Sequence, residues 1–152
     1  MKHWIACWSF WAAFLLTGCD TVNHSQIQVL PPKAEQKTRV TVPASEREVV
    51  KQVLAEIATK MRFEDRTALS LTPETICSYA QPDVKYPMCV KAWVSKDRIS
   101  IDLFQKPPEV GETEAYRKLR DQIVEQLEKH FGERLTLISK MNQVTSGASA
   151  AP

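Results

Sequence analysis

The first pattern along the chain is a pair of apolar stripes at helical spacing. Between positions 45 and 62, the apolar residues of one face are Val50, Val53, Leu54, Ile57 and Met61. Between positions 112 and 131, the corresponding residues are Tyr116, Leu119, Ile123, Leu127 and Phe131. Ser45 and Glu48 form a capping box at the start of the first stripe, and Gly132 follows the second. This spacing predicts two long amphipathic helices, each with one buried face.

Two segments between these helices alternate with a period of two. Residues 89–94 and 98–104 flank the turn sequence Ser95-Lys96-Asp97, which predicts a β-hairpin. The two faces of the second strand carry Ile99, Ile101 and Leu103 against Ser100, Asp102 and Phe104. This alternation predicts a sheet that is buried on one side only.

Three weaker segments complete the predicted fold. Residues 38–42 and 134–141 alternate enough to form strands, and Thr72-Pro73-Glu74 is typical of the start of a short helix. The element order is then strand, helix, strand, strand, helix, strand. It predicts an α+β fold, a small antiparallel sheet with two long helices on one face, in the split βαβ (ferredoxin-like) order. The folded domain is expected to span residues 45–141.

The N-terminal segment has the organisation of an export signal. Lys2 precedes an apolar stretch from Trp4 to Leu16, which is too short to span a bilayer. The stretch ends in Leu16-Thr17-Gly18-Cys19, which resembles the lipobox of bacterial lipoproteins. The resemblance implies a signal peptide over residues 1–18 and a mature chain that begins at Cys19. That cysteine would carry a diacylglycerol on its sulfur and an acyl chain, such as palmitate, on its amino group. The alternative is an ordinary signal peptide or an uncleaved anchor, in which Cys19 is incidental.

The same resemblance implies a subcellular location. Two or three acyl chains hold a soluble domain on a membrane essentially permanently, so we expect the body at the periplasmic face of a bacterial membrane. Asp20 resembles the signal that retains lipoproteins in the inner membrane of enteric bacteria. This residue favours the inner membrane, and the outer membrane is the alternative.

The two ends of the mature chain are polar and lack a sustained period. Residues 19–44 contain Pro31, Pro32 and Pro43 and are expected to form the lipidated N-terminus and a tether. If extended, this tether would reach roughly 80 Å from the membrane. Residues 142–152 are small and polar, and we expect a disordered tail there.

The cysteines of the mature chain predict a disulfide. Cys7 would leave with the signal peptide and Cys19 would carry the lipid, so Cys77 and Cys89 remain in an oxidising compartment. A Cys77–Cys89 disulfide would close a short loop and stabilise the domain by about 3 kcal/mol. The alternative is a redox or metal site, but the chain has no Cys-x-x-Cys, and zinc would need two further ligands.

Composition and charge argue against several functions. The formal net charge of +2, from 20 basic and 18 acidic residues, argues against a nucleic-acid binder that neutralises phosphates. The glycines lie too far apart for a phosphate-binding loop. The histidines left after processing are His24 in the tether and His130 in a last helical turn, where the helix dipole favours a cation. The sequence therefore predicts no enzyme, no metal site and no cofactor.

The remaining candidate site is a surface that contacts a partner. On the polar side of the predicted hairpin, Trp93 and Phe104 are rimmed by charges, as at the centre of a protein interface. The Pro-rich loop at 78–88, with Tyr79 and Tyr86, is a second candidate contact surface. The alternative for Trp93 is that it completes the core at a sheet edge.

These features lead to one functional expectation and one alternative. We expect a lipid-anchored periplasmic protein that acts as a non-enzymatic accessory or assembly subunit of a cell-envelope complex, with an envelope protein as its partner. The alternative is a periplasmic carrier of a small ligand or lipid, held in a pocket between the sheet and its helices. A deep apolar cavity would favour the carrier, whereas a filled core and an exposed aromatic sheet face would favour the interaction module.

Overall fold

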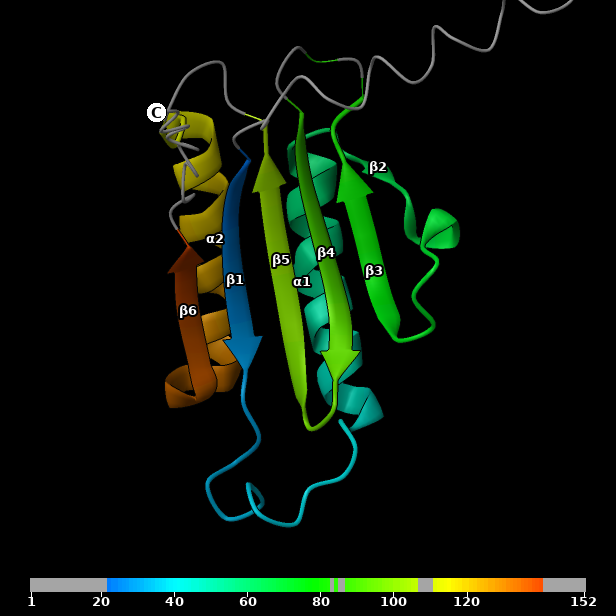
Figure 1. Cartoon of the computed structure of the whole chain (residues 1–152), viewed down its shortest axis with the longest axis vertical. Coiled ribbons are helices and arrows are strands. Elements are labelled where there is room, and N and C mark those ends of the chain that lie inside the picture. Colours follow the sequence, from blue (N-terminus) through cyan, green and yellow to red (C-terminus); the bar gives the residue numbers. More distant parts are fainter. Residues whose placement is uncertain (1–21, 83, 85–86, 107–110, 141–152) are drawn as a thin grey trace, which may run out of the picture.

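The strands of this chain form one antiparallel sheet, against which two long helices pack. The computed structural model describes residues 22–82, 84, 87–106 and 111–140. The helices and strands are β1 (Asn23–Val29), α1 (Ala44–Lys60), β2 (Glu64–Asp65), β3 (Thr75–Ala80), β4 (Met88–Ser95), β5 (Arg98–Gln105), α2 (Glu114–Phe131) and β6 (Leu135–Lys140). Short 3-10 turns occur at η2 (Thr67–Leu69) and η3 (Gly132–Arg134). The strands lie side by side in the order β2-β3-β4-β5-β1-β6 (Figure 1).

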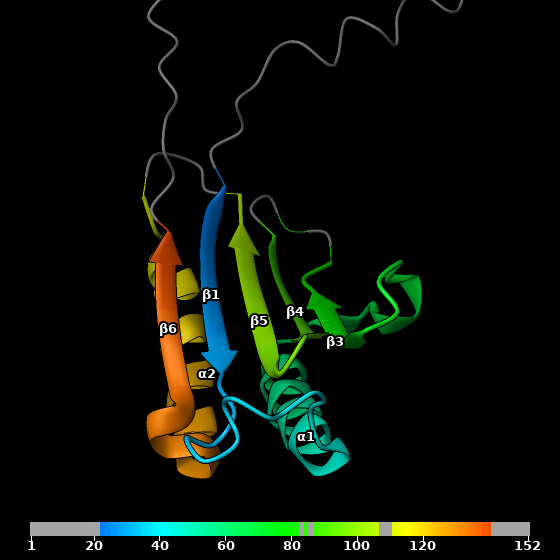
Figure 2. The ribbon, with the colours of Figure 1, turned by 60° about the horizontal axis from the view of Figure 1, so that its bottom comes forward.

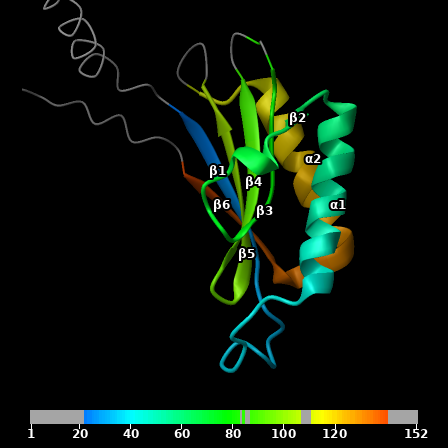
Figure 3. The ribbon, with the colours of Figure 1, turned by 90° about the vertical axis from the view of Figure 1, so that its right-hand side faces the viewer.

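Both helices cover the same face of the sheet. Figure 3 shows the sheet as one layer and α1 with α2 as the second layer beside it. Contacts to the strands divide the face between the helices, with α2 next to β1 and β6 and α1 next to β3 (Figure 2). The structure therefore confirms the α+β fold class, with an antiparallel sheet and two helices.

The helices form where the apolar stripes predict them, but their first turns differ from expectation. The N-cap of α1 is Pro43, which makes no side-chain cap hydrogen bond, so the predicted capping box of Ser45 and Glu48 is wrong. The N-cap of α2 is Thr113, whose hydroxyl accepts from the backbone N–H of Tyr116 at 3.2 Å. Gly132 ends α2 with a φ of 52°, a conformation that favours glycine.

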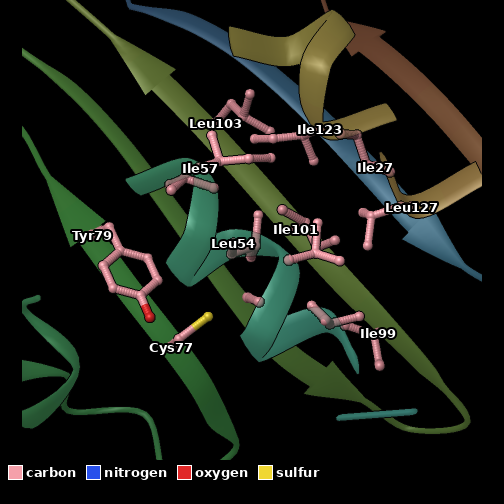
Figure 4. Packing of buried hydrophobic residues seen from close by; sticks show 14 of the residues in the cluster. Ile27, Leu54, Ile57, Cys77, Tyr79, Ile99, Ile101, Leu103, Ile123 and Leu127 are labelled. Atoms are coloured by element: carbon pink, nitrogen blue, oxygen red, sulfur yellow. The ribbon is translucent and has the colours of Figure 1, made fainter. Parts of the chain in front are cut away.

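The core lies between the sheet and the helices. In the central strands β1 and β5, the apolar residues that point toward the helices are almost fully buried, among them Ile27, Ile99, Ile101 and Leu103. Figure 4 shows their side chains meeting those of Leu54, Ile57, Ile123 and Leu127 from α1 and α2. The hydroxyl of Tyr116, a fully buried member of this core, donates to the Leu103 carbonyl at 3.0 Å. The alternation predicted for β5 is thus confirmed, with Ile99, Ile101 and Leu103 on the buried side.

The first correction concerns the segment expected to be a tether. Residues 23–29 form β1, which pairs with β5 on one side and with β6 on the other, so the folded domain begins well before residue 45. Two inward positions of β1 are polar, namely Asn23 and Ser25, which hides the apolar alternation of a buried strand. Asn23 instead donates from its amide to the Gly111 carbonyl at 2.8 Å. The strand predicted at 38–42 does not form.

The second correction concerns the segment between α1 and β4. The short helix predicted to start at Thr72 is wrong, because this segment leads directly into β3. The Glu74 carbonyl accepts from the backbone N–H of Val94 at 2.9 Å, and Thr75 pairs with Trp93. The helical turn that does form, η2, lies earlier in the chain.

The third correction concerns the predicted disulfide. Cys77 and Cys89 are both free in the structure. Cys77 pairs with Ala92, whereas Cys89 pairs with Ala80, and the alternation along β3 puts residues 77 and 80 on opposite faces of the sheet. Side chains that point to opposite faces cannot be joined without moving the backbone. Cys77 lies in the core beside Tyr79 (Figure 4), where burial is the main cause that raises its pKa to about 12.

Candidate interaction surface on the open face of the sheet

The face of the sheet opposite α1 and α2 carries a group of polar and aromatic side chains, and we call it the open face. Its central strands contribute His24, Gln26 and Gln28 from β1, Ser100, Asp102 and Phe104 from β5, and Cys89, Lys91 and Trp93 from β4. The cross-strand register places Asp102 directly between Gln26 and Lys91. Asp102 is therefore the centre of this face.

The carboxylate of Asp102 accepts hydrogen bonds from three side chains on the two neighbouring strands, β1 and β4. The Trp93 indole Nε1 donates to Oδ2 at 2.6 Å, and the Gln26 amide donates to Oδ1 at 2.9 Å. His24 places Nε2 at 3.0 Å from the same Oδ1 and donates when its proton is on that nitrogen. We call these four residues the Asp102 cluster. Both carboxylate oxygens are engaged, and the Asp102 side chain keeps only 13% of its surface exposed.

An aromatic stack extends the cluster toward one end of the sheet. The rings of His24 and Phe104 lie parallel, with centroids 4.6 Å apart and an interplanar angle of 5°. Phe104 is nevertheless 38% exposed, because the helices lie on the other side of the sheet. The stack and the Asp102 hydrogen bond together fix the plane of the imidazole, so a partly exposed aromatic surface is held in one orientation.

The segment that precedes β3 forms hydrogen bonds at the border of the open face. Lys91 donates from Nζ to the Thr72 hydroxyl at 2.9 Å, although its neighbour across the strands is Asp102. The hydroxyls of Ser70 and Thr75 are 2.7 Å apart and hydrogen-bonded, which holds the same segment. These contacts fix where the open face ends on the side of β3.

The structure brings together only part of the predicted surface. Trp93 and Phe104 share the open face, as predicted. Tyr79 does not, because it points into the core, is 7% exposed, and has its pKa raised to about 12 chiefly by burial. Tyr86 and Cys19 lie outside the described residues. The predicted second surface at 78–88 is therefore wrong in its Tyr79 part, since residues 78–80 belong to β3.

Two members of the site were missed by reasoning from the sequence. His24 and Gln26 were assigned to the tether, yet β1 carries them into the Asp102 cluster. The signal that could have found them is the run from Ser25 to Val29, in which Ile27 and Val29 alternate with glutamines. Its apolar positions are too few to distinguish a strand from a polar linker.

The open face also brings titratable side chains close to one another. The His24–Asp102 pair has the geometry of a base and its orienting carboxylate, and the Phe104 ring stacks on one face of the imidazole. Cys89 lies across β5 from His24, opposite Phe104 in register, and burial raises the pKa of its thiol. Among the described residues, no group of three or more His, Cys, Asp or Glu side chains is placed to hold a metal ion.

A groove lies at one end of the helix layer, beside the first turns of α1. It has a volume of about 490 Å³ and is bordered by Val42, Arg47, Lys51, Ile76, Val94 and Lys96. The border also includes Glu48 and Glu74, so it carries charges of both signs, and the groove lies between the first turns of α1, the start of β3 and the end of β4. It is therefore not a deep apolar cavity between the sheet and both helices.

No protein-family model matches this chain, and none of the curated proteins compared with it is a significant match. Within the part of the chain that the structure describes, neither helix has the length and apolar character that crossing a membrane requires.

Proposed function

We propose that this protein is a non-enzymatic accessory or assembly subunit of a cell-envelope complex, and that it binds its partner protein through the open face. The observation that carries the proposal is the Asp102 cluster with its Phe104 stack. Trp93 and Phe104 are residue types that contribute strongly to binding energy at interfaces. Here they are held in one orientation before any partner arrives, by hydrogen bonds of 2.6–3.0 Å and a stacked ring pair.

Pre-ordering of this kind favours binding for a physical reason. A side chain that is immobilised on binding loses conformational entropy, which opposes association by about 0.5–1.5 kcal/mol for each rotamer-rich side chain. Trp93, Gln26 and His24 have already lost much of that freedom, because each is bonded to Asp102. Binding of a partner therefore costs less conformational entropy, because these side chains are already ordered.

The subcellular location forms the second part of the proposal. We propose that Cys19 is lipidated and that the domain faces the periplasm, because Leu16-Thr17-Gly18-Cys19 follows a short apolar stretch. Asp20 favours the inner membrane, with the outer membrane as the alternative. Cys19→Ala should abolish acylation and release the protein from membranes, which fractionation and mass spectrometry of the N-terminal peptide would measure. Persistence of both would contradict the lipoprotein assignment.

The carrier function is the weaker candidate. A carrier would need an apolar pocket between the sheet and the helices, but Ile99, Ile101 and Leu103 on one side and Leu119, Ile123 and Leu127 on the other are each 1% exposed or less. The groove of about 490 Å³ near Lys51 and Lys96 has a charged border. These features favour an interaction module over a carrier of apolar molecules.

We also propose that the chain follows the split βαβ order, with β2 and β3 added at one edge. In support, the strands that remain without these two lie in the order β4-β5-β1-β6. Helix α1 comes before β4 in the chain, and α2 comes between β5 and β6. An experimental structure in which β1 does not lie between β5 and β6 would contradict this assignment.

Capture of the partner from intact cells would test the function. Cells would be crosslinked, the tagged protein purified from detergent-solubilised membranes, and the co-purifying proteins identified by mass spectrometry. We expect a dominant envelope protein, lost with Trp93→Ala and retained with Val40→Ala, a matched truncation of an 82% exposed side chain away from the sheet. Equal capture by both variants would contradict the open face as the binding surface.

A further inference from the structure

The start of β1 bears on how the domain meets a membrane, and this inference rests on the lipid anchor of the proposed function. Only Asp20, Thr21 and Val22 separate Cys19 from β1. The Cα atoms of Cys19 and Asn23 are thus at most about 14 Å apart, even in a fully extended chain. The expected tether of roughly 80 Å does not exist, because most of that segment is folded.

The short connection cannot lengthen easily. β1 is hydrogen-bonded to β5 on one side and to β6 on the other, so detaching it would break two ladders. Its first residue, Asn23, is only 8% exposed and donates to the Gly111 carbonyl. The next residue, His24, is held by Asp102 and Phe104. The point from which the anchor leaves the domain is therefore fixed.

We propose that the lipid on Cys19 holds the domain upright against the bilayer, with the sheet end that carries Asn23, Gln105 and Met88 facing the phospholipid headgroups. These three residues are cross-strand partners, so they lie together at one end of the sheet. We call it the anchor end, and it is the upper end in Figure 1. The Thr113 hydroxyl donates to the Gln105 side chain at 2.6 Å, which ties the start of α2 to the same end.

Exposed charges of both signs lie at the anchor end, because the acidic β2 and Glu114 are there as well as two cations. The C-terminus of α1 lies at this end (Figure 1), and β2, which follows it, pairs with the last residues of β3. Lys60 and Arg62 are exposed there, and within the described part of the chain neither forms an ion pair. Cations near an anionic headgroup layer each contribute about 1 kcal/mol of attraction. The turn between β4 and β5, at Lys96, lies at the opposite end and points away from the membrane.

The orientation narrows the kind of partner. Asp102 lies three residues from Gln105 along β5, which is about 10 Å at the rise of a β-strand. The Asp102 cluster is then within about 25 Å of the Cys19 Cα. The protein that binds the open face must reach this layer, so it belongs to the same membrane or lies directly against it.

Crosslinking to lipids from two ends of one helix would test the orientation. The acylated full-length mature protein would be reconstituted in vesicles of phosphatidylethanolamine and phosphatidylglycerol, with p-benzoylphenylalanine in place of Glu114 or of Glu128. Both glutamates are exposed on α2, one in its first turn and one in its last, about 21 Å apart along the helix axis. Because of this separation, we expect at least about fivefold more lipid labelling from position 114 than from position 128.

An insertion provides the control. A flexible Gly-Ser segment of about 20 residues after Thr21 leaves the anchor intact but lengthens the connection, and it should remove the difference between the two positions. Equal labelling from positions 114 and 128 in a membrane-bound, acylated protein would overturn the orientation. A difference that survives the insertion would also overturn the role given to the short connection. Absence of acylation at Cys19 by mass spectrometry would instead overturn the lipid anchor itself, so the two failures are distinguishable.

Discussion

The two faces of this sheet are made from alternate residues of the same strands, yet they are ordered by different interactions. In β5, Ile99, Ile101 and Leu103 are fully buried against the helices, and removal of apolar surface from water stabilises them. From the same strand, Asp102 and Phe104 point the other way and are ordered by three donated hydrogen bonds and one ring stack. A shift of one position along β5 therefore exchanges burial for hydrogen bonding.

This difference in ordering separates the face that determines stability from the face that is available for recognition. A hydrogen bond within a protein replaces bonds to water, so each contributes only about 0.5–1.5 kcal/mol net. Burial of Asp102 also has a desolvation cost, which the three donors offset. The open face is thus rigid without contributing much to folding, whereas the core face contributes most of the stability.

The two cysteines give the sharpest comparison of the faces, because one lies on each. In the mature chain with Cys19→Ser, a maleimide at neutral pH should label Cys89 at least about a hundredfold faster than Cys77, since Cys77 reacts only when the core opens. The pKa of Cys77 is raised to about 12, so its reactive thiolate is scarce at neutral pH as well. Mass spectrometry of timed samples measures both rates. Equal rates, or a Cys77–Cys89 disulfide in protein purified from the periplasm, would contradict this arrangement of the faces.

Truncation of a core residue should give the next largest effect. Leu103→Ala removes a fully buried side chain and should lower the free energy of unfolding by about 3 kcal/mol. Leu137→Ala is the matched control, because the same substitution on β6 affects a side chain that is 45% exposed, and it should change stability by under about 1 kcal/mol. Urea unfolding followed by circular dichroism measures both. Similar losses for the two variants would mean that burial at the centre of the sheet is not the main source of stability.

This comparison also explains what could be predicted from the sequence. The apolar stripes of both helices and the alternation of β5 predicted most of their buried positions, because buried positions are mostly occupied by apolar residues. β1 was missed because its inward residues Asn23 and Ser25 are polar, and their environment is created by α2 and by Gly111, far along the chain. The prediction of a Cys77–Cys89 disulfide was wrong for a related reason, since the face on which each cysteine lies depends on strand register.

The candidate site was partly predictable for the same reason. Trp93, Asp102 and Phe104 lie on one strand pair, so local alternation places them on one face. His24 and Gln26 reach the site from β1, whose pairing with β5 spans most of the domain. No local pattern encodes that contact. Only the half of the cluster that is local in the chain was therefore accessible to reasoning from the sequence.

A change at the centre of the open face should have a smaller effect than one in the core. In Asp102→Asn, the amide keeps one acceptor oxygen and turns an NH₂ group toward donors, so at least one of Trp93, Gln26 and His24 loses its acceptor. We expect a loss of about 1–2 kcal/mol in the free energy of unfolding. The near-ultraviolet circular dichroism of Trp93, the one tryptophan after residue 18, should also weaken.

Asp121→Asn is the matched control for this change. Its side chain is 68% exposed on α2 and pairs with Arg120 at the surface, so stability should change by less than about 0.5 kcal/mol. An Asp102→Asn variant as stable as the control, with an unchanged Trp93 signal, would show that the Asp102 cluster does not order the open face.

The smallest effect on folding should come from Phe104→Ala. The variant loses the stack on His24 and a ring that is already 38% exposed, so its free energy of unfolding should fall by only about 1 kcal/mol. Capture of the proposed envelope partner should nevertheless drop about tenfold or more, because exposed aromatic residues at an interface centre contribute 2 kcal/mol or more to binding. Leu103→Ala, its neighbour in β5, should show the opposite balance, a large loss of stability with capture retained by the folded fraction. If Phe104→Ala destabilised the fold as much as Leu103→Ala and left capture unchanged, Phe104 would behave like a core residue. The open face would then be a second core surface rather than a binding surface.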